Sequence, residues 1–281
     1  MSPEFSTDPL PKFGLGVQDI SVPDLSNAGV AALLAALYAN RFLVLKTGGL
    51  TRAEFVRFAR RIGEPIQLSA DGDYPEIAEM SNIGSDTRQY GRGAAHWHTD
   101  QSFRKRRSLA TLLYSVQVPV SGGETHFCNM VAAYDALSEK QQQQIENLVV
   151  AHRHGVSVAA RPGDHIPIPP KGWDQRRTVY HPLVRQHPVT GQKTLYAVTG
   201  TSQGIEGMAD EAGEALLRTL SDHTFQDQFV TAHWYAVNDL VIWDNPTTMH
   251  RASPISAATG PDDTRIVHRI SLRDMLEPAS S

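Results

Sequence analysis

The first sixty residues alternate between helical and strand patterns of hydrophobic side chains. Ser26 can cap a helix over residues 27–39, and residues 42–45 form the short, fully apolar segment typical of a buried strand. Thr51-Arg52-Ala53-Glu54 has the spacing of a capping box, which predicts a second helix ending at Gly63. We expect both helices to pack on one outer face of a sheet through Val30, Leu33, Leu34, Leu37, Phe55, Phe58, Ala59 and Ile62.

Short strand patterns separated by turn-forming residues dominate the rest of the chain. A helical hairpin is predicted over residues 130–137 and onward from a cap at Ser138, and a further helix over residues 210–223. Many short strands with a few helices outside predict a mainly β fold with flanking helices, built on a double-stranded β-helix, that is, a jelly-roll or cupin-like core. The strands are predicted at residues 17–20, 77–82, 109–118, 124–129, 149–154, 179–186, 194–199, 229–235, 240–244 and 265–273.

The last predicted strand alternates along its whole length. One face carries three arginines and the other three aliphatic residues with a histidine: Arg265, Arg269 and Arg273 against Ile266, His268, Ile270 and Leu272. A face with three arginines is either exposed to water or lines a cavity that binds anions. The pattern alone leaves both interpretations open.

The length of 281 residues is within the range of one large β-rich domain, so we expect a single domain over residues 1–281. Residues 1–13 are polar and contain several prolines, which predicts a flexible lead-in. Residues 155–177 hold many Pro, Gly and charged residues, which predicts an insertion or a lid. Glycine-rich loops between residues 65 and 97 are either arms that close over a bound molecule or plain connections.

Composition and charge narrow the classes of protein that fit. The net charge is −4, so no overall basic field argues for nucleic-acid binding. The single cysteine, Cys128, excludes an internal disulfide framework and a cysteine-rich zinc or iron–sulfur site within the chain. The N-terminus lacks the pattern of a secretory signal, and no apolar run approaches the length of about eighteen residues that a membrane span needs. We therefore expect a cytoplasmic protein without a membrane partner.

The stretch around His98-Thr99-Asp100 carries the candidate chemistry. On an extended backbone, side chains two residues apart point to the same side with Cα atoms about 6–7 Å apart, so His98 and Asp100 can bind one metal ion. His250 is the best candidate for a third ligand. Two imidazoles and one carboxylate on one face of a metal leave open positions, as in non-haem Fe(II) sites that use dioxygen. A His96/His98 pair is the competing arrangement, but it leaves Asp100 without a role.

Five motifs give the chain its resemblance to a known family. From about residue 14 to residue 274 it resembles the taurine dioxygenase and 2,4-dichlorophenoxyacetate dioxygenase family of Fe(II)- and 2-oxoglutarate-dependent oxygenases. The motifs stand in the family's order: His98-Thr99-Asp100, Gly122-Gly123-Glu124-Thr125, Trp243-Asp244-Asn245, His250-Arg251-Ala252, and Arg265 followed by Arg269.

The resemblance implies a role for each site residue. His98, Asp100 and His250 would hold Fe(II). Thr125 and Arg265 would hold the far carboxylate of 2-oxoglutarate, and the substrate would be bound by Arg269 and Asn82. The family also implies a homodimer or a homotetramer.

The resemblance further implies a single catalytic domain that couples oxidative decarboxylation of 2-oxoglutarate by O2 to hydroxylation of a small anionic organic molecule. Where the attacked carbon bears an ether oxygen, as in an aryloxyalkanoate, the product collapses to a phenol and an oxo acid. Three alternatives remain open. They are a hydroxylase or desaturase of secondary metabolism, a metalloenzyme on the same barrel that does not use 2-oxoglutarate, and a non-catalytic binding protein.

Overall fold

The largest element of the fold is a seven-stranded sheet. The computed structural model describes residues 4–68, 72–84, 95–155, 157–160 and 177–273. The strand order of this sheet is β1-β2-β3-β13-β5-β15-β4, and all neighbouring pairs are antiparallel except β2 and β3. Its strands are β1 (Ser6–Pro9), β2 (Leu15–Gln18), β3 (Phe42–Lys46), β4 (Ala78–Ser81), β5 (Ser108–Gln117), β13 (Asp239–Asp244) and β15 (Ile266–Arg273).

Three smaller sheets complete the β structure of the described residues. One has the order β12-β6-β14, with strands β12 (Val230–His233), β6 (Thr125–Asn129) and β14 (Thr248–Ala252). The second has the order β11-β7-β8, with strands β11 (Ser202–Ile205), β7 (Val149–His152) and β8 (Val179–Pro182). The third pairs β10 (Lys193–Leu195) with β9 (Val184–Gln186).

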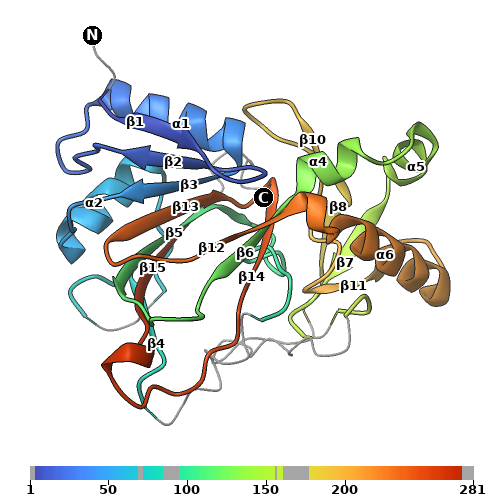
Figure 1. Cartoon of the computed structure of the whole chain (residues 1–281). Helices are drawn as coiled ribbons and strands as arrows, with labels where there is room; N and C mark the ends of the chain where they lie inside the picture. The colour runs from blue at the N-terminus through green and yellow to red at the C-terminus, as the bar shows by residue number, and fades with distance from the viewer. Residues whose placement is uncertain (1–3, 69–71, 85–94, 156, 161–176, 274–281) are drawn as a thin grey trace.

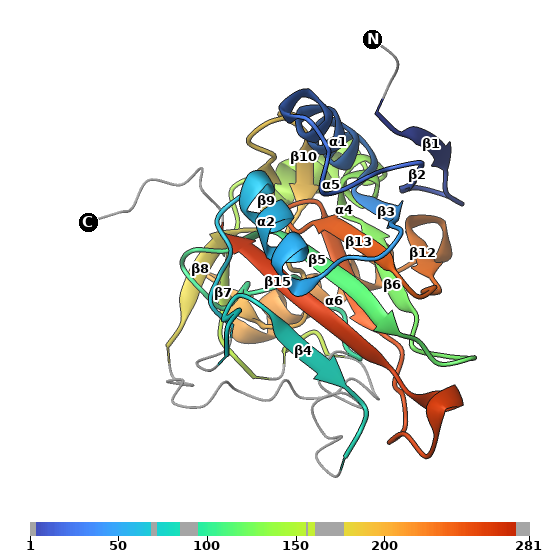
Figure 2. The same cartoon turned by 90° about the vertical axis from the view of Figure 1, so that its left-hand side faces the viewer.

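The helices lie on two sides of this β structure. The helices α1 (Asn27–Asn40) and α2 (Arg52–Ile62) lie against the large sheet (Figure 2). The helices α4 (Met130–Asp135), α5 (Glu139–Ile145) and α6 (Asp210–Thr224) gather with β7, β8 and β11 on the other side (Figure 1). The prediction of a mainly β chain with flanking helices is confirmed. No helix within the described ranges is long and apolar enough to cross a membrane.

The first two helices begin as their local sequences predict. The Ser26 side chain accepts a hydrogen bond from the Gly29 amide, and Thr51 and Glu54 form the reciprocal bonds of a capping box. These bonds satisfy backbone amides that have no partner within the first helical turn. Gly63 follows α2 as its C-terminal cap.

Strand β3 shows why the large sheet has two buried faces. Leu43 and Leu45 point into the hydrophobic cluster under α1 and α2. Phe42 and Val44 point the opposite way, into a second cluster that includes Phe127 of β6. The rings of Phe42 and Phe127 are stacked with centroids 4.5 Å apart. The β12-β6-β14 sheet therefore packs on the inner face of the large sheet.

The arginine face of β15 also points into this interior. Ile270 and Leu272 pack in the cluster under the helices, whereas Val267 belongs to the interior cluster on the other face. Arg265 shares the inner face with Val267 and is only 8% exposed. The structure therefore divides the three arginines, because Arg265 and Arg269 face the interior, whereas Arg273 is partly exposed and pairs with Glu64.

The strand predictions differ from the structure in several places. Residues 6–9 form β1 in the lead-in that was expected to be flexible. The predicted strand 179–186 is two strands, β8 and β9, separated at Leu183. Strands β11 and β14 were not predicted. The proposed lid at residues 155–177 lies largely outside the described residues.

Candidate metal centre

The two histidines that were predicted as ligands are brought together by backbone pairing. His98 and His250 form an isolated antiparallel bridge, in which each amide donates to the other's carbonyl oxygen, with N···O distances of 3.0 and 2.9 Å. His250 lies on β14, opposite Phe127 of β6. Their imidazole rings lie side by side with centroids 4.3 Å apart. A pair this close can bind a single ion.

Asp100 completes the group from the turn that follows His98. One of its carboxylate oxygens, Oδ1, lies 3.8 Å from His98 Nε2, and the other, Oδ2, lies 3.7 Å from His250 Nε2. The three residues offer ligand atoms that all lie within 4.8 Å of one another, and no further such group occurs in the part of the chain that the structure describes. Asp100 and His250 are buried. The donor set has the composition of a two-histidine, one-carboxylate site.

The ionisation of these three groups suits a metal. Burial lowers the pKa of His98, and it lowers the pKa of His250 further with the help of neighbouring His98. Burial would raise the pKa of Asp100, but the positive charge of Arg269, together with the neighbouring histidines and the hydrogen bond from Thr111, outweighs it and holds the pKa below its ordinary value. Two neutral imidazoles and one carboxylate are the forms that bind a divalent cation.

His96 holds the ring of His98 in place. The carbonyl oxygen of His96 lies 2.9 Å from His98 Nδ1, so this nitrogen carries the proton and Nε2 is free to face Asp100. The His96 ring packs on that of His98 with centroids 4.8 Å apart, but His96 is not in the ligand group. The competing His96/His98 arrangement is therefore not favoured by the geometry.

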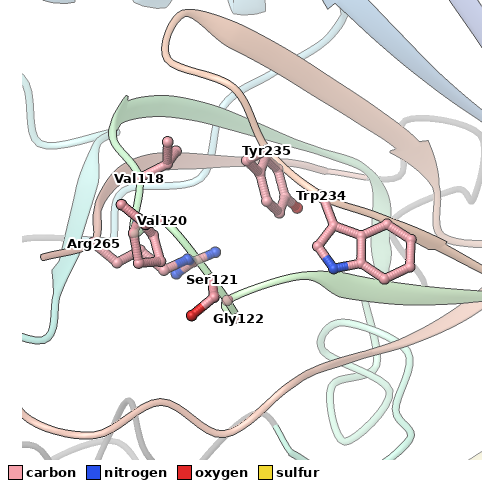
Figure 3. A pocket seen from close by; sticks show the side chains of 9 residues that line it. Val118, Val120, Ser121, Gly122, Trp234, Tyr235 and Arg265 are labelled. Atoms are coloured by element: carbon pink, nitrogen blue, oxygen red, sulfur yellow. The ribbon is translucent and has the colours of Figure 1, made fainter. Parts of the chain in front are cut away.

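Arg265 lies at the edge of a cavity of about 70 Å³ next to the Gly122-Gly123 turn. Its guanidinium forms no ion pair with any carboxylate of the described residues, and burial lowers its pKa. Figure 3 shows the guanidinium close to Ser121 and Gly122, with the rings of Tyr235 and Trp234 across the cavity. A buried cation without a counter-ion marks a place where an anion would be bound.

Thr125 lies at the same end of the interior. Its hydroxyl oxygen is 2.7 Å from the hydroxyl of Tyr235, and the Arg265 guanidinium lies 5.5 Å from the centroid of the Tyr235 ring. Thr125 is two residues before Phe127 on β6, and Phe127 is the partner of His250 across the sheet. The structure thus brings Thr125 and Arg265 into contact with the same residue, Tyr235. Thr125 lies two residues along β6 from the strand partner of His250, a candidate metal ligand. Burial raises the pKa of Tyr235 to about 12, so its hydroxyl remains a donor at neutral pH.

Arg269 and Asn82 have different surroundings. Arg269 Nη2 donates to Asp100 Oδ1 at 2.5 Å, so this arginine lies directly at the candidate metal site. The Asn82 side chain donates to the carbonyl oxygens of Ser256 and Asp263 and accepts from the Arg265 amide. The role of Asn82 in substrate binding stays a prediction, and its amide is bonded to the backbone at three points.

Two polar contacts of this site could not be read from the sequence. Tyr235 ends a predicted strand, but nothing in that pattern relates it to Thr125 or Arg265. Thr111 donates to Asp100 Oδ2 at 2.6 Å from within an apolar strand, where a threonine is unremarkable in sequence. Each contact joins residues from different strands of the fold, so only the three-dimensional arrangement reveals it.

Known proteins are similar to this chain in both sequence and fold. A family model described as "Taurine catabolism dioxygenase TauD, TfdA family" matches residues 6–271. The alpha-ketoglutarate-dependent 2,4-dichlorophenoxyacetate dioxygenase of Cupriavidus pinatubonensis is 32% identical over 266 residues, covering 86% of this chain and 89% of that protein. The (S)-phenoxypropionate/alpha-ketoglutarate-dioxygenase of Sphingobium herbicidovorans is 31% identical over 273 residues, covering 90% of this chain and 91% of that protein.

A solved structure agrees with these sequence matches. The crystal structure of AAD-2 in complex with Mn(II) and N-oxalylglycine superposes with a TM-score of 0.79 at 28% identity, covering 98% of this chain and 99% of that one. The match to the family model spans nearly the whole chain, including every candidate ligand. The chain therefore belongs to the TauD/TfdA family of dioxygenases.

Proposed function

We propose that this protein is an Fe(II)- and 2-oxoglutarate-dependent dioxygenase that hydroxylates a small anionic organic molecule. The observation that carries the proposal is the combination of two features in one interior. A two-histidine, one-carboxylate group contacts Arg269, and four residues before Arg269 stands the buried Arg265, which has no carboxylate partner among the described residues. A metalloenzyme that does not use 2-oxoglutarate would have no need for the second feature.

The residues present fit both groups. His98, Asp100 and His250 would hold Fe(II) as neutral imidazoles and a carboxylate. Arg265 and Thr125 would hold the far carboxylate of 2-oxoglutarate, with the Tyr235 hydroxyl next to Thr125 as a third polar contact. Arginine suits this task because its planar fork can donate two parallel hydrogen bonds to a carboxylate.

Iron with O2 supplies the oxidation, in which 2-oxoglutarate becomes succinate and CO2 and one oxygen atom enters a C–H bond of the substrate. The protein contributes position and charge. Asp100 stays ionised and the histidines stay neutral, so the ligand set is ready at neutral pH. The interior position of Arg265 excludes water from the cosubstrate's far end.

We propose an aryloxyalkanoate as the substrate, because the two relatives compared above are named for aryloxy acids. Arg269 is the proposed partner of its carboxylate, and Asn82 is the other proposed substrate residue. Hydroxylation of the carbon next to the ether oxygen gives a hemiacetal, which collapses to a phenol and an oxo acid. Hydroxylation or desaturation in secondary metabolism is the second candidate.

We also propose the architecture and setting that this function implies. The large sheet and the β12-β6-β14 sheet facing it form the two halves of a jelly-roll core, which supports a double-stranded β-helix. Residues 1–281 form one catalytic domain, with residues 155–177 as an insertion or lid. The protein acts in the cytoplasm as a homodimer or homotetramer.

Visible absorption under anaerobic conditions tests the cofactors. Chelation of Fe(II) by the keto-acid end of 2-oxoglutarate gives a weak band in the visible range, so the band should appear when wild-type protein receives both. Arg265→Ala should need about tenfold or more 2-oxoglutarate to form it, since a hydrogen bond to a charged group is worth about 1.5–3 kcal/mol. Arg273→Ala is the matched control, because Arg273 ends the strand that Arg265 precedes and pairs with Glu64.

The result separates the alternatives. If iron binds and no band forms with 2-oxoglutarate, the dioxygenase proposal is wrong and a different metalloenzyme is indicated. If the band forms, a panel of aryloxyalkanoates, alkyl sulfonates and simple carboxylates is screened for succinate release that depends on the added compound. Phenol release from aryloxyalkanoates alone would support ether cleavage, whereas turnover of other classes alone would refute that substrate.

A further inference from the structure

The Trp243-Asp244-Asn245 motif has no role in the proposed site, yet it is entirely buried next to it. Trp243 is 3% exposed, and Asp244 and Asn245 are fully buried. Trp243 and Asp244 end β13, and Asn245 begins the turn that leads to β14 and His250. A fully buried side-chain amide is costly unless its hydrogen bonds are satisfied, so the contacts of Asn245 show what this motif does.

The direction of the hydrogen bonds around Asn245 is fixed by Trp243. An indole N–H can only donate, and Trp243 Nε1 lies 3.2 Å from Asn245 Oδ1, so the amide oxygen must face the indole. The amide nitrogen then faces away from Trp243. It donates one hydrogen to Ser108 Oγ and the other to Thr111 Oγ1, both at 3.0 Å.

The hydrogen bond from Asn245 also fixes the direction of the next bond, which Thr111 makes to the Asp100 carboxylate. Because its hydroxyl oxygen accepts from Asn245, the single hydroxyl hydrogen is left for Asp100 Oδ2 at 2.6 Å. A carboxylate can only accept, which agrees with this polarity. Trp243, Asn245 and Thr111 therefore form a one-way chain of three hydrogen bonds that ends on Asp100.

We propose that Thr111 and Asn245 are positioning residues for the metal site, which orient the Asp100 carboxylate so that one edge faces the two histidines. The proposal rests on the metal site proposed above. Thr111 holds Oδ2 and Arg269 holds Oδ1, so both oxygens are anchored from the protein side. The same two oxygens lie near the histidines, Oδ1 at 3.8 Å from His98 Nε2 and Oδ2 at 3.7 Å from His250 Nε2.

These three hydrogen bonds connect the Trp243-Asp244-Asn245 motif to the distant His98-Thr99-Asp100 motif. Asn245 sits five residues before His250, on the connection between β13 and β14, while Thr111 sits on β5, which pairs with β13. One motif therefore sets the orientation of the carboxylate ligand and leads directly into the strand of a histidine ligand. Partners of this kind typically change metal affinity about 10–100-fold when they are removed.

Titration with Co(II) alone tests this role without any turnover. Thr111→Val removes the hydroxyl at nearly constant volume, and we expect about tenfold or greater loss of Co(II) affinity with a shifted d–d absorption spectrum. Thr111→Ser keeps the hydroxyl and should restore both readouts. Thr224→Val is the matched control, because Thr224 is equally buried at the end of α6 and its hydroxyl makes no hydrogen bond within the described residues. Thr111→Ala replaces the valine variant if the latter does not fold.

A second set of variants tests whether Asn245 acts on the metal site through Thr111. Asn245→Ala should weaken Co(II) binding less than Thr111→Val, and the double variant should be no weaker than Thr111→Val alone, because both act through one hydroxyl. Additive losses, or a Thr111→Val protein with wild-type affinity and spectrum, would overturn the proposal. A wild-type protein that binds no Co(II) would instead refute the metal site. Thermal unfolding of the metal-free variants monitors the fold.

Discussion

At the scale of single residues, Gly122 and Gly123 are neighbours in the turn before β6 and have nearly the same φ angle. Their φ angles are +77° and +74°, which L side chains rarely adopt. Their surroundings differ. A Cβ on Gly122 would meet nothing within 4 Å, whereas a Cβ on Gly123 would lie 3.1 Å from Arg265 Cδ. Substitutions at the two glycines therefore distinguish the effect of backbone strain from the effect of contact with Arg265, the candidate arginine for the cosubstrate.

Gly123→Ala is expected to weaken 2-oxoglutarate binding about fivefold, because a displaced guanidinium loses part of a hydrogen bond worth about 1.5–3 kcal/mol. Gly122→Ala should show the same loss of stability, about 1 kcal/mol from the left-handed backbone, with unchanged 2-oxoglutarate affinity. Anaerobic titration of the Fe(II) proteins measures the affinity, and thermal unfolding measures the stability. Equal affinities for the two variants would mean that Arg265 does not hold the cosubstrate.

The candidate metal ligands could be predicted from the sequence, and the residues that contact them could not. His98 and Asp100 are two residues apart, so the local geometry of the backbone places them on one side. The interaction of Thr111 with Asp100 depends on how β5 passes behind the ligand turn, and that of Tyr235 with Thr125 depends on the pairing of β12 with β6. Neither arrangement follows from residue type or spacing.

At the scale of elements, the connection between β12 and β13 carries Tyr235 into the interior and is held by Asp239. One carboxylate oxygen of Asp239 accepts from the Ala236 amide and lies 3.0 Å from His233 Nε2, and the other pairs with Lys46 at 2.7 Å. Burial raises the pKa of Asp239, but these partners outweigh it, so the pKa in the folded protein lies below its ordinary value. Folding therefore favours the ionised form.

The lowered pKa of Asp239 determines how its contribution to stability changes with pH. The stabilisation is complete above the ordinary carboxyl pKa of about 3.9 and is lost as the pH falls through the lower pKa of the folded state. Asp239→Asn should cost about 1–3 kcal/mol of unfolding free energy near pH 7, with a smaller difference in acid. Urea unfolding near pH 7 and in acid measures the unfolding free energy of both proteins. Asp227→Asn, which breaks an exposed pair with Lys12, should change little at either pH.

The elements that the sequence predicted well are those with local signals. The caps of α1, α2 and α5 lie within a few residues of their helices, and all three have the predicted side-chain bonds. Strand β14 is different, because the run from Thr248 to Ala252 has no alternation of apolar and polar residues. It becomes a strand by pairing with β6. This pairing places His250 opposite Phe127 and therefore decides the position of one ligand.

At the scale of the whole molecule, the candidate metal site joins parts of the chain that no local signal connects. His98 and Asp100 precede β5, whereas His250 lies on β14 of the smaller sheet. In the unfolded chain these ligands are far apart, so the metal site exists only when the sheets have assembled. A metal that binds only the folded form stabilises it by mass action.

Mn(II) should therefore stabilise the wild-type protein by about 2.7 kcal/mol at a free concentration one hundred times its Kd. His250→Ala should lose this increment, whatever its stability without metal. His268→Ala should keep it, because His268 lies on the opposite face of β15 next to Glu79 and contributes no ligand atom. Urea unfolding with and without Mn(II) gives the increment for each protein. If His250→Ala gained as much as the wild type, the metal would bind elsewhere, and the assignment of three ligands from two separated segments would be wrong.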